Sequence, residues 1–171
     1  MNYTTLYSLA DIEVAVNKLA LQIQKDYQYK KITIICVLKG AIVFCSDLIR
    51  SLSDSDIELD FIQCQSYEGT ESNNNPMINI KPCIPLKGKH VLIVEDIVDT
   101  GQSLSLIQEY IAKQKPKTLK AVVLINKPHR RQIGVTINYT GFTAPDKFVV
   151  GYGMDWNEKF RNLKRISIFN Q

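Results

Sequence analysis

Residues 91–104 read VLIVEDIVDTGQSL, and this stretch decides what kind of fold the chain adopts. Its first four residues are aliphatic and mostly β-branched, which is typical of a buried strand. The strand ends in two adjacent carboxylates, Glu95 and Asp96, and the chain continues through Asp99. Apolar residues at helical spacing begin near Ser103, so strand, polar turn and helix follow one another directly.

The same alternation extends on both sides of this stretch. Short apolar runs predict further buried strands at Ile32–Leu38, Leu59–Cys64, Ala121–Ile125 and Phe148–Val150. Helical spacing predicts helices at 41–52 and 104–111, and a covering helix from Ser8 to about Tyr27 in which Ser8 and Asp11 form a capping box. We therefore expect an α/β fold with a mostly parallel twisted sheet flanked by helices. In such folds ligands bind beyond the carboxyl ends of the strands.

The composition suits one domain that covers residues 1–171, because 45% of the residues are hydrophobic. The sequence starts with no cleavable leader and has no apolar segment long enough to span a membrane, so we expect a cytoplasmic protein. Its four cysteines are widely spaced, which favours buried free thiols over disulfides or a zinc site. The net charge of +4 suits an anionic substrate as well as a nucleic acid, and excludes neither.

One segment interrupts the alternation of strands and helices. Residues 66–76 read SYEGTESNNNP, with almost no apolar content and many turn-forming residues. The segment is longer than a plain connection. It indicates either a disordered loop or a lid over a functional site.

The turn after the central strand has the properties of a phosphate site. A turn that enters a helix offers free backbone N–H groups and the positive end of the helix dipole. Thr100 and Ser103 add hydroxyl donors, and Gly101 lets the backbone approach a ligand closely. Glu95 and Asp96 suit the two hydroxyls of a ribose, so a 5-phosphoribosyl group would match both features. The alternative is that the two acids end a strand in solvent and that Thr100 only caps a helix.

Two further strand ends carry a lysine. Lys39 and Gly40 follow the first predicted strand, where Lys39 would either hold an anion or lie on the surface. Lys127 follows the strand at 121–125, and Pro128 biases it away from helix. The segment after residue 145 mixes aromatic, acidic and basic residues; on chemistry alone, Phe148 is a core residue more readily than a stacking platform.

The segment from Glu95 to Gly101 resembles the signature with which type I phosphoribosyltransferases bind phosphoribosyl pyrophosphate (PRPP), in the variant of the hypoxanthine-guanine branch. The LKG sequence at 38–40, the NKP sequence at 126–128 and the DKFVVGY sequence at 146–152 match other motifs of that family in the same order. The similarity runs from about Ile32 to Phe169. It implies the type I phosphoribosyltransferase fold, with a small hood formed by the N- and C-terminal segments.

The resemblance also implies a role for each matching residue. Asp99 is the catalytic acid/base, and PRPP is bound by Glu95, Asp96, Thr100, Gly101, Gln102, Ser103, Lys39, Gly40 and Arg161. A cis peptide commonly precedes the lysine of the LKG loop. The purine is bound by Lys127, Phe148, Val149 and Asp155, and Mg²⁺ involves Glu95, Asp96 and Asp155. Ser66 and Tyr67 begin the flexible lid at 66–76. Gln102 departs from members that carry a basic residue there.

These matches predict a purine salvage enzyme that transfers the phosphoribosyl group of PRPP to hypoxanthine, and to guanine, with Mg²⁺ as cofactor. The ammonium of Lys127 donates hydrogen bonds only, so it favours a 6-oxopurine over adenine. We expect a homodimer or homotetramer that binds neither nucleic acid nor membrane. Three alternatives stay open: an enzyme that prefers xanthine, an RNA-binding regulator that senses PRPP or nucleotides, and an inactive homologue.

Overall fold

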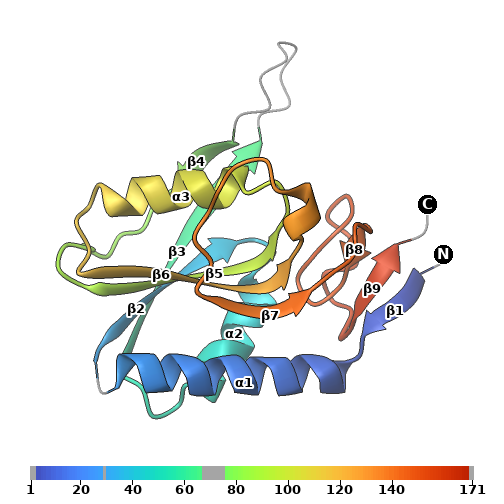
Figure 1. The fold of residues 1–171 in the computed structure, drawn as a ribbon, viewed down its shortest axis with the longest axis horizontal. Helices are drawn as coiled ribbons and strands as arrows, with labels where there is room; N and C mark the ends of the chain where they lie inside the picture. Colours follow the sequence, from blue (N-terminus) through green and yellow to red (C-terminus); the bar gives the residue numbers. More distant parts are fainter. Residues whose placement is uncertain (1–2, 29, 67–75, 170–171) are drawn as a thin grey trace.

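The computed structural model describes residues 3–28, 30–66 and 76–169, and its centre is a six-stranded twisted sheet (Figure 1). The strand order is β4-β3-β2-β5-β6-β7, and every neighbouring pair is parallel except β3 and β4. The strands are β2 (Ile32–Leu38), β3 (Ile57–Ser66), β4 (Pro76–Ile80), β5 (His90–Val98), β6 (Thr118–Asn126) and β7 (Tyr139–Thr143). The expected mostly parallel α/β fold is confirmed.

Helices cover both faces of this sheet (Figure 1). Helices α1 (Leu9–Tyr27) and α2 (Ile42–Ser51) pack on one face, and α3 (Gln102–Ala112) lies on the other. The capping box at the start of α1 is present, because Asp11 N donates to Ser8 Oγ at 3.2 Å and Ser8 N donates to Asp11 Oδ2 at 2.8 Å. The sequence signal for this helix start is therefore confirmed.

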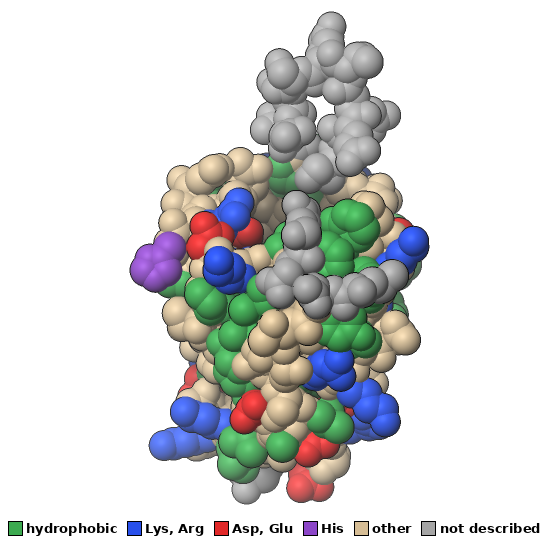
Figure 2. All heavy atoms as spheres, turned by 90° about the vertical axis from the view of Figure 1, so that its right-hand side faces the viewer, with side chains coloured by type: hydrophobic (Ala, Val, Ile, Leu, Met, Phe, Trp, Pro, Cys, Tyr) green, Lys and Arg blue, Asp and Glu red, His purple; other side chains and the backbone are tan. Residues whose placement is uncertain are grey.

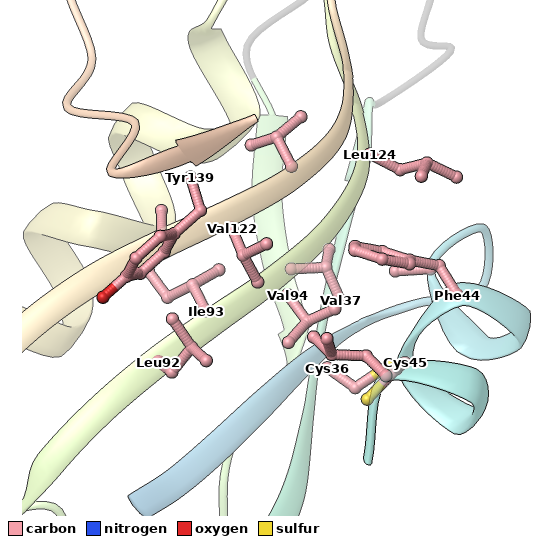
Figure 3. Packing of buried hydrophobic residues seen from close by; sticks show 14 of the residues in the cluster. Cys36, Val37, Phe44, Cys45, Leu92, Ile93, Val94, Val122, Leu124 and Tyr139 are labelled. Carbon is pink, nitrogen blue, oxygen red and sulfur yellow. The ribbon is translucent and has the colours of Figure 1, made fainter. Parts of the chain in front are cut away.

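The hydrophobic core lies between the sheet and helices α1, α2 and α3, and Figure 3 shows part of it, including the packing beside α2. Phe44 of α2 is completely buried and lies with Val37 and Val94 of the sheet. Cys36 and Cys45 are part of the same packing, and all four cysteines are free thiols. The expected burial holds for Cys36 and Cys45, whereas Cys64 is only partly buried and Cys83 is exposed. A well-packed layer of this kind holds the strand ends in fixed positions relative to one another.

A second, smaller sheet combines the two ends of the chain. Strands β1 (Tyr3–Tyr7), β9 (Ile166–Phe169) and β8 (Val149–Val150) pair antiparallel in the order β1-β9-β8. This is the hood that the family resemblance implies, and it stands beyond the ends of β6 and β7 (Figure 1). The predicted strand at Phe148–Val150 is present as the buried β8, but it belongs to this second sheet and not to the parallel one. A three-residue apolar run does not encode its partner, and here it pairs with β9.

The central strand is longer than predicted. β5 continues to Val98, so Glu95 and Asp96 lie inside the strand instead of ending it. The extension is stabilised by the register with β6, which pairs Glu95 with Val123 and Val98 with Asn126.

Among the described residues, no helix is both long and apolar enough to cross a membrane. Most of the expected lid, residues 67–75, lies outside the described part of the chain.

Candidate active site

The predicted site residues gather where the carboxyl ends of β2 and β5 meet the hood. A cleft of about 240 Å³ is lined by Lys39 and Gly40 from the loop after β2, by Glu95 and Asp96 from β5, and by Asp155 and Arg161 from the hood. A second hollow, of about 110 Å³, is formed by the turn from Asp99 to Ser103 at the start of α3. Both hollows share Glu95, so they adjoin.

Glu95 and Asp96 are buried, each with 7% of its surface exposed. Burial raises the pKa of both carboxyls above their usual range, and for Glu95 the adjacent charge of Asp96 adds to the increase. Asp96 Oδ1 accepts a hydrogen bond from Ile97 N at 2.9 Å. The alternative that these acids end a strand in solvent is therefore wrong. Two buried carboxylates that face a polar cleft are costly to the fold and suit a ligand with hydroxyl donors or a cation.

The turn after β5, which the sequence predicts to bind phosphate, has a tightly constrained backbone. Gly101 has φ of +90°, and a Cβ there would lie 2.7 Å from the carbonyl oxygen of Ile133. Only glycine fits this position without strain. The carbonyl of Thr100 accepts hydrogen bonds from Gln132 N and Ile133 N at 2.9 and 3.1 Å, so the turn is held by the segment after β6. Thr100, Gly101 and Ser103 border the hollow at the N-terminus of α3.

Gln102 begins α3, and its side chain donates to Gln132 Oε1 at 3.1 Å. Gln102, which departs from the family pattern, therefore joins the turn to the segment after β6.

The loop after β2 lies directly against Asp96. The peptide bond between Leu38 and Lys39 is cis, as the resemblance implies. A Cβ on Gly40 would lie 2.0 Å from Asp96 Oδ2, so a side chain at this position would displace that carboxylate. A Cβ on Gly153 would lie 2.0 Å from the carbonyl oxygen of Gly40, which shows how closely the hood packs on this loop. The Lys39 ammonium is half-exposed beside the cleft.

Lys39 and Arg161 share an acidic residue that the sequence analysis did not identify. Glu158 Oε1 lies 3.2 Å from Lys39 Nζ, and Glu158 Oε2 lies 3.2 Å from Arg161 Nη2. Asp155 Oδ1 lies 2.8 Å from Arg161 Nη2. The two cations predicted to bind pyrophosphate are thus bridged through Glu158. The sequence offered one signal for Glu158, namely its position three residues before Arg161.

On the opposite side of the site, Lys127 is buried with 4% of its surface exposed. Its Nζ donates to the carbonyl oxygen of Lys147 at 2.6 Å, which leaves two further donors. Burial lowers the pKa of the Lys127 ammonium, and the charge of Asp99 partly offsets this effect.

Asp99 Oδ1 lies 2.7 Å from Arg130 Nε, and Arg130 Nη1 lies 3.0 Å from Asp146 Oδ1. Arg130 and Asp146 were also missed by the sequence analysis.

Phe148 is half-exposed, with 48% of its surface accessible, so the interpretation of this residue as core is wrong. Its ring meets Phe169 edge-on with centroids 6.4 Å apart, and Phe169 N donates to the Phe148 carbonyl at 2.9 Å. Trp156 stacks on the same Phe169 ring at 5.0 Å. Val149, the next residue, is buried in β8. Figure 2 shows the end of the molecule at the right of Figure 1, where hydrophobic side chains cover much of the surface between acidic and basic groups.

The structure places the three predicted metal-binding residues in one region but describes only one of the two residues predicted to begin the lid. Within residues 3–28, 30–66 and 76–169, no three histidine, cysteine or acidic side chains form a cluster that could hold a metal ion by themselves. Glu95 and Asp96 are adjacent, whereas Asp155 pairs with Arg161 in the same cleft. Ser66 is the last residue of β3, and Tyr67 falls outside the described residues.

Comparison with known proteins gives one consistent answer. A family model described as a phosphoribosyl transferase domain matches residues 2–157. A hypoxanthine-guanine phosphoribosyltransferase of Streptococcus pneumoniae is 39% identical over 97% of this chain and 92% of its own length. A hypoxanthine-guanine-xanthine phosphoribosyltransferase of Tritrichomonas foetus is 37% identical over 97% and 91%. A crystal structure of a hypoxanthine-guanine phosphoribosyltransferase from Bacillus anthracis superposes with a TM-score of 0.92, at 40% identity over 98% of each chain.

Proposed function

The chain belongs to the phosphoribosyl transferase domain family, and we propose that it is a purine salvage enzyme that converts hypoxanthine or guanine and PRPP into IMP or GMP and pyrophosphate. The observation that carries this function is the buried Glu95–Asp96 pair, which lies between the turn predicted to bind phosphate and a cleft bordered by two cations. That sequence of groups matches the phosphate, ribose and pyrophosphate of PRPP in order.

In this reaction the bond from C1 of the ribose to the pyrophosphate oxygen breaks, and a bond from N9 of the purine to C1 forms. Pyrophosphate leaves with the bonding electrons, so C1 gains positive charge in the transition state. The nearby carboxylates of Glu95 and Asp96 stabilise this charge while they accept hydrogen bonds from the ribose hydroxyls. Lys39 and Arg161 lie in the same cleft and would bind the departing pyrophosphate.

Asp99 is our candidate for proton transfer. The purine loses one proton when N9 attacks, and a carboxylate beside the five-membered ring can accept this proton from N7. Asp99 lies in the turn between β5 and α3, opposite Lys127, so it stands between the predicted phosphate site and the purine side of the site.

Purine recognition would depend on Lys127, Phe148 and the backbone of Val149. The two remaining donors of the Lys127 ammonium suit the 6-oxo group of hypoxanthine or guanine and cannot accept from the 6-amino group of adenine. The exposed Phe148 ring offers a flat apolar face for stacking. We expect Ser66 and Tyr67 to begin a lid over the bound substrates.

Mg²⁺ is the cofactor that we expect with PRPP. The donor set fits a divalent cation, because Glu95 and Asp96 are buried side by side and a positive charge near them would offset their repulsion. Glu95 and Asp96 would hold the ion, and Asp155, which lines the same cleft, would accept hydrogen bonds from water beside it. When bound, Mg²⁺ supplies charge neutralisation for the pyrophosphate leaving group. We also expect a cytoplasmic homodimer or homotetramer that binds no nucleic acid.

A spectrophotometric assay with PRPP, Mg²⁺ and each of hypoxanthine, guanine, xanthine and adenine tests this function. We expect turnover of hypoxanthine and guanine and little of adenine. Turnover confined to xanthine would support the xanthine-preferring alternative. The absence of turnover with all four purines, from a chain that still binds a nucleoside monophosphate, would refute the enzymatic function.

A further inference from the structure

A chain of ion pairs links the proposed proton-transfer residue to the hood. Arg130 lies at the end of the short 3-10 helix Pro128–Arg130 that follows β6. Its Nε lies 2.7 Å from Asp99 Oδ1, and its Nη1 lies 3.0 Å from Asp146 Oδ1 in the loop before β8. One guanidinium therefore contacts carboxylates from two segments that are far apart in the sequence.

The two oxygens of Asp99 differ in their surroundings. Oδ1 is completely buried, and although Arg130 Nε is close to it, no donor is aligned with it in hydrogen-bond geometry. The side chain as a whole is 36% exposed, so the carboxylate meets the open site through Oδ2. The contact with Arg130 thus fixes which oxygen faces the hollow that adjoins the proposed ribose site.

We propose that Arg130 is a positioning residue for the transfer reaction: anchored by Asp146, it holds Oδ1 of Asp99 and leaves Oδ2 directed at the N7 proton of the purine. The inference rests on the proposed function, since it assigns Arg130 a role through Asp99. An arginine suits this position because its rigid guanidinium can contact two carboxylates through different nitrogens.

A contribution to fold stability does not explain the ion pairs of Arg130. The side chains of Arg130, Asp99 and Asp146 are 48%, 36% and 58% exposed, and ion pairs that are this open contribute little to stability. In the described part of the chain the ion-pair partner of Asp99 is Arg130 and not Lys127, whose ammonium donates to the carbonyl of Lys147. A free carboxylate on a turn rotates about two side-chain bonds, so tethering one oxygen orients the other.

Steady-state kinetics of an Arg130→Gln variant test the proposal. We expect kcat to fall by about tenfold, because the carboxylate remains but is misoriented, while the KM for PRPP and the melting temperature stay unchanged. His129→Gln is the matched control, since His129 is an exposed neighbour in the same 3-10 helix and should give wild-type kinetics. Asp146→Asn removes only the anchor and should lower kcat in the same direction by a smaller factor.

The decisive measurement repeats Arg130→Gln in an Asp99→Asn background. If Arg130 acts through Asp99, the second substitution costs nothing further, so the two effects are not additive. An undiminished tenfold loss in that background, or a loss that appears in the KM for PRPP, would show that Arg130 contacts a substrate directly and would overturn the proposal. Should Arg130→Gln fail to fold, Asp146→Asn with and without Asp99→Asn gives the same comparison. A wild-type chain without transferase activity would overturn the proposed function as well, whereas an active wild type with an unimpaired Arg130→Gln would overturn only this inference.

Discussion

Replacing Gly40 with alanine tests whether the loop after β2 sets the position of the Asp96 carboxylate, which we propose binds the ribose. The new Cβ would lie 2.0 Å from Asp96 Oδ2 and 2.7 Å from its Cγ, whereas non-bonded contacts are comfortable only beyond roughly 3.5 Å. The carboxylate must therefore retreat by about 1 Å or more. Asp96 is buried and accepts a hydrogen bond from Ile97 N at 2.9 Å, so it cannot turn away without losing that bond.

The expected loss is mainly catalytic. A misplacement of about 1 Å at a reacting centre costs on the order of 10²-fold in rate, which corresponds to about 2.7 kcal/mol in the activation barrier. The lost hydrogen bond to a charged group would reduce the free energy of unfolding by roughly 1.5–3 kcal/mol. We therefore expect kcat/KM for PRPP to fall about 100-fold, in a protein that still folds.

Initial rates of IMP formation at varied PRPP, together with thermal melting curves, provide the measurement. Gly134→Ala is the control, because a Cβ at Gly134 would meet no atom within 4 Å. It should behave as wild type in both assays. A Gly40→Ala variant whose kcat/KM for PRPP stays within about twofold of wild type would show that Asp96 does not need its observed position, and the reasoning from its packing would fail.

Three further substitutions test separate parts of the site. Asp99→Asn should lower kcat by roughly 10²–10⁴-fold with little change in PRPP affinity, measured by calorimetric titration; normal kcat with weakened PRPP binding would make Asp99 a binding residue. Glu95→Gln should abolish transfer. It should also raise the melting temperature by a few degrees, which corresponds to a gain of roughly 1 kcal/mol in the free energy of unfolding. The reason is that burial raises the pKa of Glu95, so its ionised form costs folding free energy at neutral pH. That cost shrinks as the pH falls toward 4.5, the ordinary pKa of a glutamate, so the melting curves of variant and wild type should converge on acidification. A variant that is less stable than wild type at neutral pH would contradict this reasoning. Phe169→Ala removes the ring and loosens the strand end against Phe148, so the KM for hypoxanthine should rise several-fold while that for PRPP does not; equal changes in both would indicate general disorder of the hood.

The sequence alone determined the strand and helix alternation, the capping box of α1, and the short motifs from which the family was inferred. These are local properties: a period of two or 3.6 residues, or a few adjacent side chains, is complete within one segment. The extent of β5 was underestimated because Glu95 and Asp96 look like solvent-facing residues when only their neighbours in sequence are considered. Their burial depends on the hood and on the Gly40 loop, which close over the strand end from elsewhere in the chain.

Only the tertiary structure decided which charges meet. Asp99, Arg130 and Asp146 lie on three different connections, and nothing in the spacing of these residues predicts that one guanidinium would join the two acids. Glu158 lies only three residues from Arg161 in the sequence, but its contact with Lys39 arises because the hood packs on the loop after β2. Pairing between distant segments depends on how the layers pack and not on local pattern, since the free energy that selects it comes from surface buried when the whole chain is folded.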